Sequence, residues 1–293
     1  MLEIFLPFWG DPGYLYEAVA SVQAQTDPDW RLVVVDDHYP DPAVAEFFAR
    51  LDDPRVRYLR NKVNLGIAAN FERCRRLATG ELVVFLGCDD VLHPTFVSRA
   101  RTVLAGFPRA AMLQPGVRVV DGSGTEVRPV ADRTKDLLRP RTSRPRELSG
   151  EDLAASLLRG NWVYWPSLVF RREWIAERSF RLDHAIVLDL ALILDVVRAG
   201  GTLVLDPEVT FSYRRHAESL SSTAAVDGSR FHDDRRYFAE IADHLERDGW
   251  SRAARTARRR WVSRLHALTL LPGALRSPDR SRSLRQIWLH LTR

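Results

Sequence analysis

The chain has 293 residues, 45% hydrophobic and 28% charged, which allows one large α/β domain or two small ones and excludes a disordered protein. Two cysteines exclude a disulfide framework or a Cys/His zinc site. No stretch reaches the ~20 apolar residues that span a bilayer and no basic leader is present, so a soluble cytoplasmic protein is expected.

The first 105 residues alternate between apolar runs and helical patterns. Strands are predicted at residues 2–6, 32–35, 56–59 and 82–86, with helices at 14–25, 42–51, 66–78 and from 94 to about 104. This alternation predicts an α/β fold with an open, mostly parallel sheet and helices on both faces. Ligands bind such sheets beyond the carboxyl ends of the strands.

The second half of the chain is less regular. Residues 121–149 are polar and weakly patterned, which indicates a mobile connection. Helices are predicted from about 172 to 177 and from 186 to 198, and a strand at 203–205. From about residue 228 the pattern is helical to the end, with breaks at Gly249, Pro272-Gly273 and Pro278.

Two pairs of aspartates follow predicted strands, and the pair Asp89-Asp90 is the stronger signal. Adjacent carboxylates repel each other, so they need a cation or hydrogen-bond donors, and Mg²⁺ typically binds through one or two carboxylates plus substrate phosphates. The alternative is a helix cap before Pro94. The pair Asp36-Asp37 repeats the arrangement and favours one functional crevice. Neither common glycine-rich phosphate loop is present, so phosphate is expected to be bound through metal.

Several segments resemble glycosyltransferase family 2, inverting enzymes with a glycosyltransferase-A fold. They are Leu-Pro-Phe-Trp at 6–9, Ser-Val-Gln-Ala-Gln-Thr at 21–26, Leu-Val-Val-Val-Asp-Asp at 32–37, Asn-Leu-Gly at 64–66 and Gly-Glu-Leu-Val-Val-Phe-Leu-Gly-Cys-Asp-Asp-Val-Leu-His-Pro at 80–94, with looser matches at 166–172, 188–189 and 213–216. The resemblance implies a catalytic domain over 1–222, with a nucleotide-sugar-binding half at 1–110 and an acceptor-side half at 150–222. A basic helical extension over 223–293 would follow.

The resemblance also implies roles on the donor side of the site. Pro7 and Trp9 would border the base, with Trp9 stacking on it, and Asn64 would lie on the same side. Asp37 would accept a hydrogen bond from the base, which favours uracil or thymine.

The metal and the base follow from the same resemblance. Asp90 would be the ligand of Mn²⁺ or Mg²⁺, and Asp89 would hold the ribose or the metal shell, although these two roles are interchangeable. Asp189 would be the catalytic base. His216 would contact the diphosphate or the metal, with an ordinary loop histidine as the alternative.

The sequence departs from the family pattern at two positions. Many members carry an acid two residues before Asp89, where this chain has Gly87, and an acid just before the base, where it has Leu188. The first departure weakens the inference of metal binding. The second leaves Asp189 as the acid of the motif, with Asp183 and Asp195 as nearby rivals.

The predicted activity is metal-dependent, inverting transfer of a sugar from a UDP or dTDP sugar to a hydroxyl acceptor. The acceptor is expected on a cell-surface polysaccharide or a glycolipid, including a lipid-linked glycan. One alternative is a nucleotidyltransferase, which normally needs a glycine-rich basic loop that residues 7–12 do not form. The other is an inactive homologue that kept the nucleotide-sugar pocket.

Two further features allow alternatives. The aromatic run at 161–165, which ends in Trp165, forms either a platform for an acceptor sugar or part of the core.

Residues 251–293 hold eleven arginines against one acid, although the net charge of the chain is only +5. Arginines beside Trp261, Leu265, Leu268 and Leu271 fit either a helix on an anionic membrane, hence a peripheral location at the plasma membrane, or a helix packed on the domain. No nucleic-acid recognition motif is present.

Overall fold

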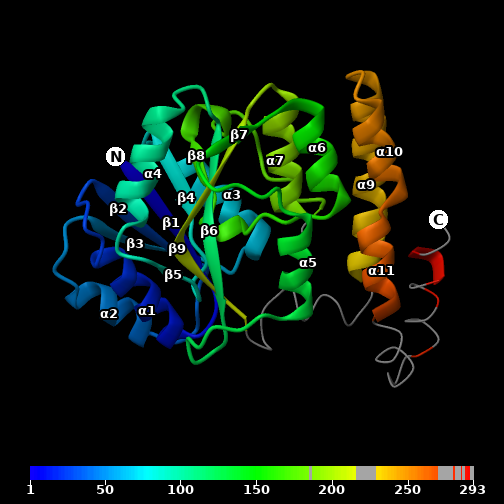
Figure 1. The fold of residues 1–293 in the computed structure, drawn as a ribbon. Coiled ribbons are helices and arrows are strands. Elements are labelled where there is room, and N and C mark those ends of the chain that lie inside the picture. The colour runs from blue at the N-terminus through cyan, green and yellow to red at the C-terminus, as the bar shows by residue number, and fades with distance from the viewer. Residues whose placement is uncertain (185–186, 216–228, 270–279, 281–284, 286–287, 291–293) are drawn as a thin grey trace.

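One sheet runs through the molecule, and its first four strands are all parallel (Figure 1). The computed structural model describes residues 1–184, 187–215, 229–269, 280, 285 and 288–290. The parallel strands lie in the order β3-β2-β1-β4 and span β1 (Leu2–Phe8), β2 (Trp30–Asp36), β3 (Val56–Arg60) and β4 (Leu82–Phe85). They are connected by α1 (Pro12–Gln23), α2 (Ala43–Arg50) and α3 (Ile67–Leu77).

The antiparallel pairs all lie in the second half of the sheet. β8 (Val169–Arg171) pairs antiparallel with β4 and with β6 (Met112–Val120), and β6 pairs parallel with β9 (Leu203–Arg214). The short strands β5 (Val91–Leu92) and β7 (Arg146–Leu148) pair antiparallel with β9. The predicted α/β fold with an open, mostly parallel sheet is confirmed, and β9 is much longer than predicted.

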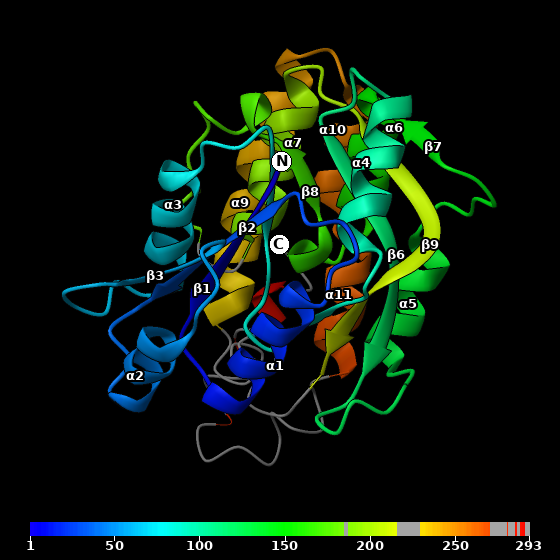
Figure 2. The same ribbon diagram turned by 90° about the vertical axis from the view of Figure 1, so that its left-hand side faces the viewer.

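Helices cover both faces of the sheet, as predicted. On one face α1, α2 and α4 (Phe96–Gly106) pack against the sheet, and on the other lie α3, α6 (Gly150–Arg159), α7 (Leu188–Arg198), α9 (Ser229–Arg247) and α10 (Ser251–Arg259). Figure 2, seen from the side of α1 and α2, places α9 and α10 behind the sheet. The continuous apolar runs of β1, β2 and β4 follow from this double cover, because both of their faces are buried.

The strand register brings the functional segments to one edge. Phe8 lies opposite Asp36 on β2, and Phe5 lies opposite Phe85 on β4. The backbone N–H of Asp37 then donates to the carbonyl of Phe8 at 3.0 Å. The residues that follow β1, β2 and β4 therefore leave the sheet at the same edge. There β1 lies between β2 and β4, which both follow it in sequence, and ligands bind open α/β sheets at such a point.

The connection expected to be mobile at 121–149 contains regular structure. It forms α5 (Val130–Leu138) and β7, and the Asp132 side chain on α5 is buried. The prediction was wrong because the contacts that hold this segment are distant in sequence: the hydroxyl of Tyr164 and the guanidinium of Arg215 both donate to Asp132. The helix predicted after Arg172 is a single 3-10 turn, Arg172–Trp174.

The helices that follow β9 share a core with the rest of the chain. Tyr237, Phe238 and Ile241 of α9 and the alanines of α10 belong to the same buried cluster as α6 and α7. The small side chains of Ala253, Ala254 and Ala257 make up the buried positions of α10. The division at residue 222 stays a prediction, but α9 and α10 are packed on the domain. In the described part of the chain, the helices are too short or too polar to cross a bilayer.

Candidate functional site

The turn after β4 carries a carboxylate with an unsatisfied oxygen. Asp90 is 1% exposed, and its Oδ1 accepts a hydrogen bond from the backbone N–H of Arg214 at 2.9 Å. Its buried Oδ2 has no hydrogen-bond partner in the described structure. Burial, and then the charge of Asp89, raise the pKa of Asp90. An ionised carboxylate here is costly without a cation, which makes this oxygen a fitting metal ligand.

The absence of an acid at position 87 follows from the shape of this turn. A Cβ atom on Gly87 would lie 2.4 Å from Oδ2 of Asp90 and 3.1 Å from Oδ1 of Asp89. A side chain at residue 87 therefore collides with the two carboxylates as they stand.

The protein ligands available to a metal are few. The residues that the structure describes include no group of three or more His, Cys, Asp and Glu side chains that could hold a metal ion. Asp89 and Asp90 fit the simpler pattern for Mn²⁺ or Mg²⁺, in which phosphates and water complete the shell. His216 lies outside the described residues.

Arg214 anchors the aspartate turn, and the sequence analysis assigned it no role. Its Nε donates to the carbonyl of Asp89 at 2.7 Å, and its Nη2 donates to Glu17 on α1 at 2.6 Å. The guanidinium also lies 4.6 Å from the ring centroid of Tyr14. Arg214 therefore connects β9, α1 and the turn, and its place beside His216 in the family-like segment was the signal that could have identified it.

The predicted donor-side residues lie at the carboxyl edge of the sheet. Pro7 lies within β1, and Trp9 follows it with 52% of its surface exposed. The Trp9 ring meets Tyr39 edge-on at 5.6 Å. Asn64 is exposed, and its side-chain oxygen accepts from the backbone N–H of Gly66 at 3.0 Å. Because half of its surface is exposed, the indole is accessible to a ligand at this edge of the sheet.

The first aspartate pair is engaged in holding loops. Asp37 is buried, and its carboxylate accepts from the backbone N–H groups of Leu65 and Gly66, both at 2.8 Å, and from the side chain of Asn61. Asp36 is also buried and accepts from the backbone of Tyr39 and the hydroxyl of Tyr58. The two pairs therefore differ: Asp36 and Asp37 are bonded to neighbouring loops, whereas Oδ2 of Asp90 has no hydrogen-bond partner in the described structure.

Asp189 lies in the first turn of α7 with one side-chain partner. Asn161 donates to its Oδ2 at 3.2 Å. Burial raises the pKa of Asp189, against the opposing effects of the Leu190 amide, the Lys135 charge and Asn161. A carboxyl with a raised pKa suits a proton acceptor. Leu188 is buried in the core, which explains the lack of an acid there.

The two rival acids are engaged in ion pairs. Arg181 lies 3.1 Å from Asp183 and lowers the pKa of that carboxyl to about 2. Asp195 lies on α7 with Arg198 3.8 Å away. The geometry therefore favours Asp189.

Helix α5 links Asp189 to the aspartate turn, although the sequence analysis assigned it no functional residue. The ammonium of Lys135, whose charge acts on Asp189, lies 4.2 Å from the ring centroid of Tyr164. Tyr164 donates to Asp132, and Asp132 holds Arg215 through two hydrogen bonds of 3.0 and 3.1 Å. Arg215 in turn lowers the pKa of Asp90, in opposition to burial. The signal available was that Lys135 is one of only two lysines in the chain.

Trp165 lies in an aromatic cluster. Its ring stacks on Phe85 at 5.7 Å and is surrounded by Phe71, Phe170 and Phe180. Only 9% of its surface is exposed. The structure favours the core over a sugar platform, because four rings already cover the indole.

Comparison with known sequences identifies related proteins. The model of the family "Glycosyl transferase family 2" matches residues 3–159. The uncharacterized protein Rv1520 of Mycobacterium tuberculosis is 28% identical over 229 residues, which cover 76% of this chain and 61% of that protein. The succinoglycan biosynthesis protein ExoO of Rhizobium meliloti is 25% identical over 217 residues, 73% of this chain and 60% of ExoO. The chain thus spans about three fifths of the length of these relatives.

Two solved structures share the fold. Staphylococcus aureus TarS 1–349 in complex with UDP-GlcNAc has a TM-score of 0.64 and 16% identity, over 83% of this chain and 66% of that one. The mannosyltransferase PcManGT from Pyrobaculum calidifontis, in complex with GDP-Man and Mn²⁺, has a TM-score of 0.60 and 17% identity, over 99% of this chain and 84% of that one. The chain has the glycosyltransferase-A fold, and α9–α11 form its C-terminal helical region.

Replacing Lys135 tests the electrostatic setting of Asp189. The Lys135 charge favours the ionised carboxylate, so Lys135→Met is expected to raise the pKa of Asp189 further. Carbon-detected NMR titration of ¹³C-labelled aspartate measures this shift. Lys62→Met, which removes the other, exposed lysine, should leave the titration unchanged. Equal titration curves in Lys135→Met and the parent protein would contradict the assignment.

Proposed function

Because this chain belongs to glycosyl transferase family 2, we propose that it transfers a sugar from a UDP or dTDP sugar to a hydroxyl acceptor, inverting the anomeric centre. The observation that carries the proposal is the buried Asp90 carboxylate, with its unpartnered oxygen, beside Asp89 at the carboxyl edge of the parallel strands. That edge is where ligands bind open α/β sheets.

Asp89 and Asp90 would hold Mn²⁺ or Mg²⁺, which supplies positive charge beside the diphosphate leaving group. The structural neighbour PcManGT, in complex with Mn²⁺, supports this choice of ion. Arg215 adds a fixed cation near the same carboxylates, and its two bonds to Asp132 hold it in place. A cation fixed in advance stabilises developing charge without reorganisation.

The donor's base would stack on Trp9 beside Pro7, with Asn64 on the rim. Asp37 anchors the backbone of residues 65 and 66, so it shapes the pocket next to Asn64. Its direct hydrogen bond to the base stays a prediction. A uracil base is supported by TarS, whose structure is in complex with UDP-GlcNAc.

Asp189 would take the proton of the acceptor hydroxyl as that oxygen attacks the anomeric carbon. The bond between the anomeric carbon and the diphosphate oxygen breaks in the same displacement, which inverts the centre. Asn161 orients the carboxylate, and its hydrogen bond favours the ionised form that accepts the proton. A positioned general base contributes about 10²–10⁴-fold.

The acceptor would be a growing cell-surface polysaccharide or a glycolipid. This is supported by ExoO, a relative named for succinoglycan biosynthesis. Such an acceptor is often carried on lipid, which makes the surface of the C-terminal helices relevant.

Helix α11 (Trp261–Thr269) would place the protein on an anionic membrane surface. Trp261, Leu265 and Leu268 are 62%, 58% and 42% exposed and follow one another at helical spacing. Exposed Arg255 and Arg259 precede them on α10. An exposed apolar stripe beside arginines is typical of interfacial helices.

The neighbouring arginines are not all available for this. Arg258 pairs with Glu246 at 2.9 Å and with Asp243 at 3.3 Å, and Arg260 is buried. Helix α10 therefore fits the alternative of a helix packed on the domain, whereas the exposed residues of α11 support the alternative of a helix on the membrane.

A thermal-shift screen of nucleotide sugars with and without Mn²⁺ tests donor binding. A UDP or dTDP sugar with Mn²⁺ should raise the melting temperature by a few degrees, because ligand binds only the folded state. Asp90→Asn should remove the part that depends on Mn²⁺, and Asp52→Asn, an exposed carboxylate before β3, should keep it. No shift with any nucleotide sugar would overturn the proposed function.

Replacing the base tests the chemistry. Asp189→Asn should bind donor with unchanged affinity and transfer sugar about 10²–10⁴ times more slowly. Asp195→Asn, on the same helix, should transfer at nearly the parent rate. Activity is measured as nucleotide release with acceptor present. Parent-like turnover by Asp189→Asn would exclude Asp189 as the base, and donor binding without any turnover would identify an inactive homologue.

Sedimentation with vesicles tests the membrane surface. Trp261→Ser combined with Leu265→Ser should bind vesicles that contain phosphatidylglycerol about 10- to 100-fold more weakly, because two apolar side chains no longer enter the bilayer. Leu137→Ser removes a leucine of α5 that is even more exposed, at 77%, and should bind as the parent does. Equal binding by both variants would contradict the assignment.

A further inference from the structure

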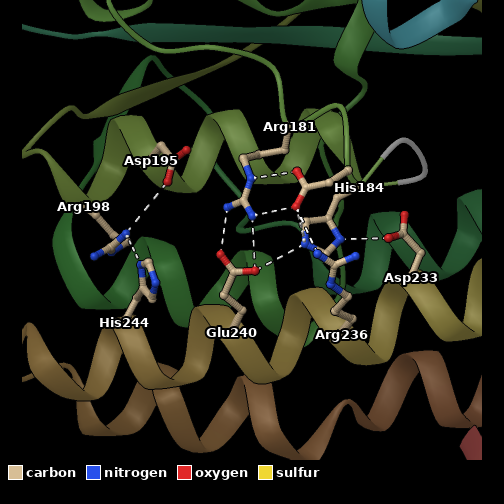
Figure 3. A network of polar contacts seen from close by, with 9 residues as sticks. Arg181, His184, Asp195, Arg198, Asp233, Arg236, Glu240 and His244 are labelled. Atoms are coloured by element: carbon tan, nitrogen blue, oxygen red, sulfur yellow. Dashed lines mark hydrogen bonds and ion pairs between the residues drawn. The ribbon is translucent and has the colours of Figure 1, made fainter.

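A polar network fastens the segment before α7 to helix α9 (Figure 3). Arg181 donates to both carboxylate oxygens of Glu240, through Nη1 at 2.9 Å and Nη2 at 3.2 Å. It also donates to Asp183 through two bonds of 3.1 Å. Arg236 of α9 approaches Asp183 at 3.4 Å from the other side. The segment and the helix are thus joined by several charged contacts.

His184 lies at the centre of this network and is fully buried. Its Nδ1 lies 2.8 Å from Asp233 and its Nε2 lies 3.3 Å from Glu240, both on α9. Ionised carboxylates only accept hydrogen bonds, so a ring nitrogen of His184 that bonds one of them does so as an N–H donor. The ring of Tyr237 packs edge-on against it at 5.4 Å.

Three basic side chains of the network face three carboxylates. Arg181, His184 and Arg236 face the carboxylates of Asp183, Asp233 and Glu240. Arg181 lowers the pKa of Asp183 to about 2 and, against burial, lowers that of Glu240. Only the His184 side chain is fully buried, and the other members of the network are 17–58% exposed. Removing a carboxylate that contacts the buried ring therefore leaves a buried N–H group without its partner.

The network continues into the turn that carries the candidate base. The carbonyl of His184 accepts from the backbone N–H of Val187 at 3.2 Å, and the carbonyl of Val187 accepts from Ala191 in α7 at 2.9 Å. Asp189 lies between these two points, in the first turn of the helix. The start of α7 is therefore set by where α9 holds His184.

We propose that α9 positions the base: His184, held between Asp233 and Glu240, is a positioning residue for Asp189. The inference rests on the proposed role of Asp189 and gives the C-terminal helices a part in turnover. A reacting group misplaced by about 1 Å costs about 10²-fold in rate. Loosening the network should therefore lower kcat and leave donor binding intact.

The far end of α7 offers a matched control. There Arg198 donates to Asp248 at 2.6 Å and lies 3.1 Å from His244 of α9. Asp248→Asn removes an ion pair between the last residue of α7, nine residues beyond Asp189, and the residue that directly follows α9. This variant therefore measures how loosening of α7 affects turnover while the turn that carries Asp189 keeps its contacts.

The experiment compares His184→Gln, Glu240→Gln and Asp248→Asn in the full chain. Hydrogen exchange of the backbone amides at 184–191 should become about tenfold faster in the first two variants and stay unchanged in the third. Their kcat should fall about 10- to 100-fold with an unchanged KM for the donor. Asp248→Asn should keep its kcat even where its melting temperature drops. Glu240→Gln, at a partly exposed site, serves as the second variant should His184→Gln fail to fold.

Two results would overturn the inference. One is parent-like amide exchange at 184–191 in both His184→Gln and Glu240→Gln. The other is the same loss of kcat in Asp248→Asn. The exchange measurement needs no activity, so a parent protein that transfers no sugar would refute the proposed function separately from the positioning role of α9.

Discussion

The candidate site depends on one electrostatic constraint, the burial of the Asp90 carboxylate next to Asp89. One oxygen is satisfied by the backbone N–H of Arg214, and the other has no hydrogen-bond partner within the described structure. Burial and the neighbouring charge raise the pKa of Asp90, so the ionised form needs a cation at the unpartnered oxygen. The surroundings are consistent with this need, since Gly87 leaves room for both carboxylates and Arg214 ties the turn to α1.

The second half of the chain serves this turn through side chains from distant segments. Asp132 of α5 is buried because it bonds both Tyr164 and Arg215, and Arg215 lies near Asp90. Lys135, one helical turn further along, acts on Asp189. A single short helix thus contributes to the charge balance at both the turn proposed to bind metal and the proposed base. Pairs of ionisable groups whose surroundings shift their pKa values are typical of catalytic sites, although ion-pair networks also produce such shifts.

The C-terminal helices have one surface that packs on the core and another that is exposed. The inner faces of α9 and α10 belong to the core, and α9 also presents Asp233 and Glu240 to His184. The outer stripe of α11 leaves Trp261, Leu265 and Leu268 exposed. Packing and membrane binding were alternatives for one amphipathic tail. In the folded protein α10 is packed, because its alanines allow close contact, and the exposed side chains of α11 carry the proposal of membrane binding.

The sequence by itself determined the elements of the first half, the carboxyl edge at which Asp37, Asp89 and Asp90 emerge, and the family. These features are local: an apolar run buried on both faces indicates a parallel strand, and the residues directly after the run lie at the strand's carboxyl end. Only the tertiary structure decided that Asp36 and Asp37 hold loops, that Trp165 is covered by phenylalanines, and that α5 exists as an ordered helix carrying Asp132. In each case the partner side chains lie on other segments of the chain. Whether a polar or aromatic group is buried depends on the side chains that these segments place around it. A local sequence pattern does not contain that information.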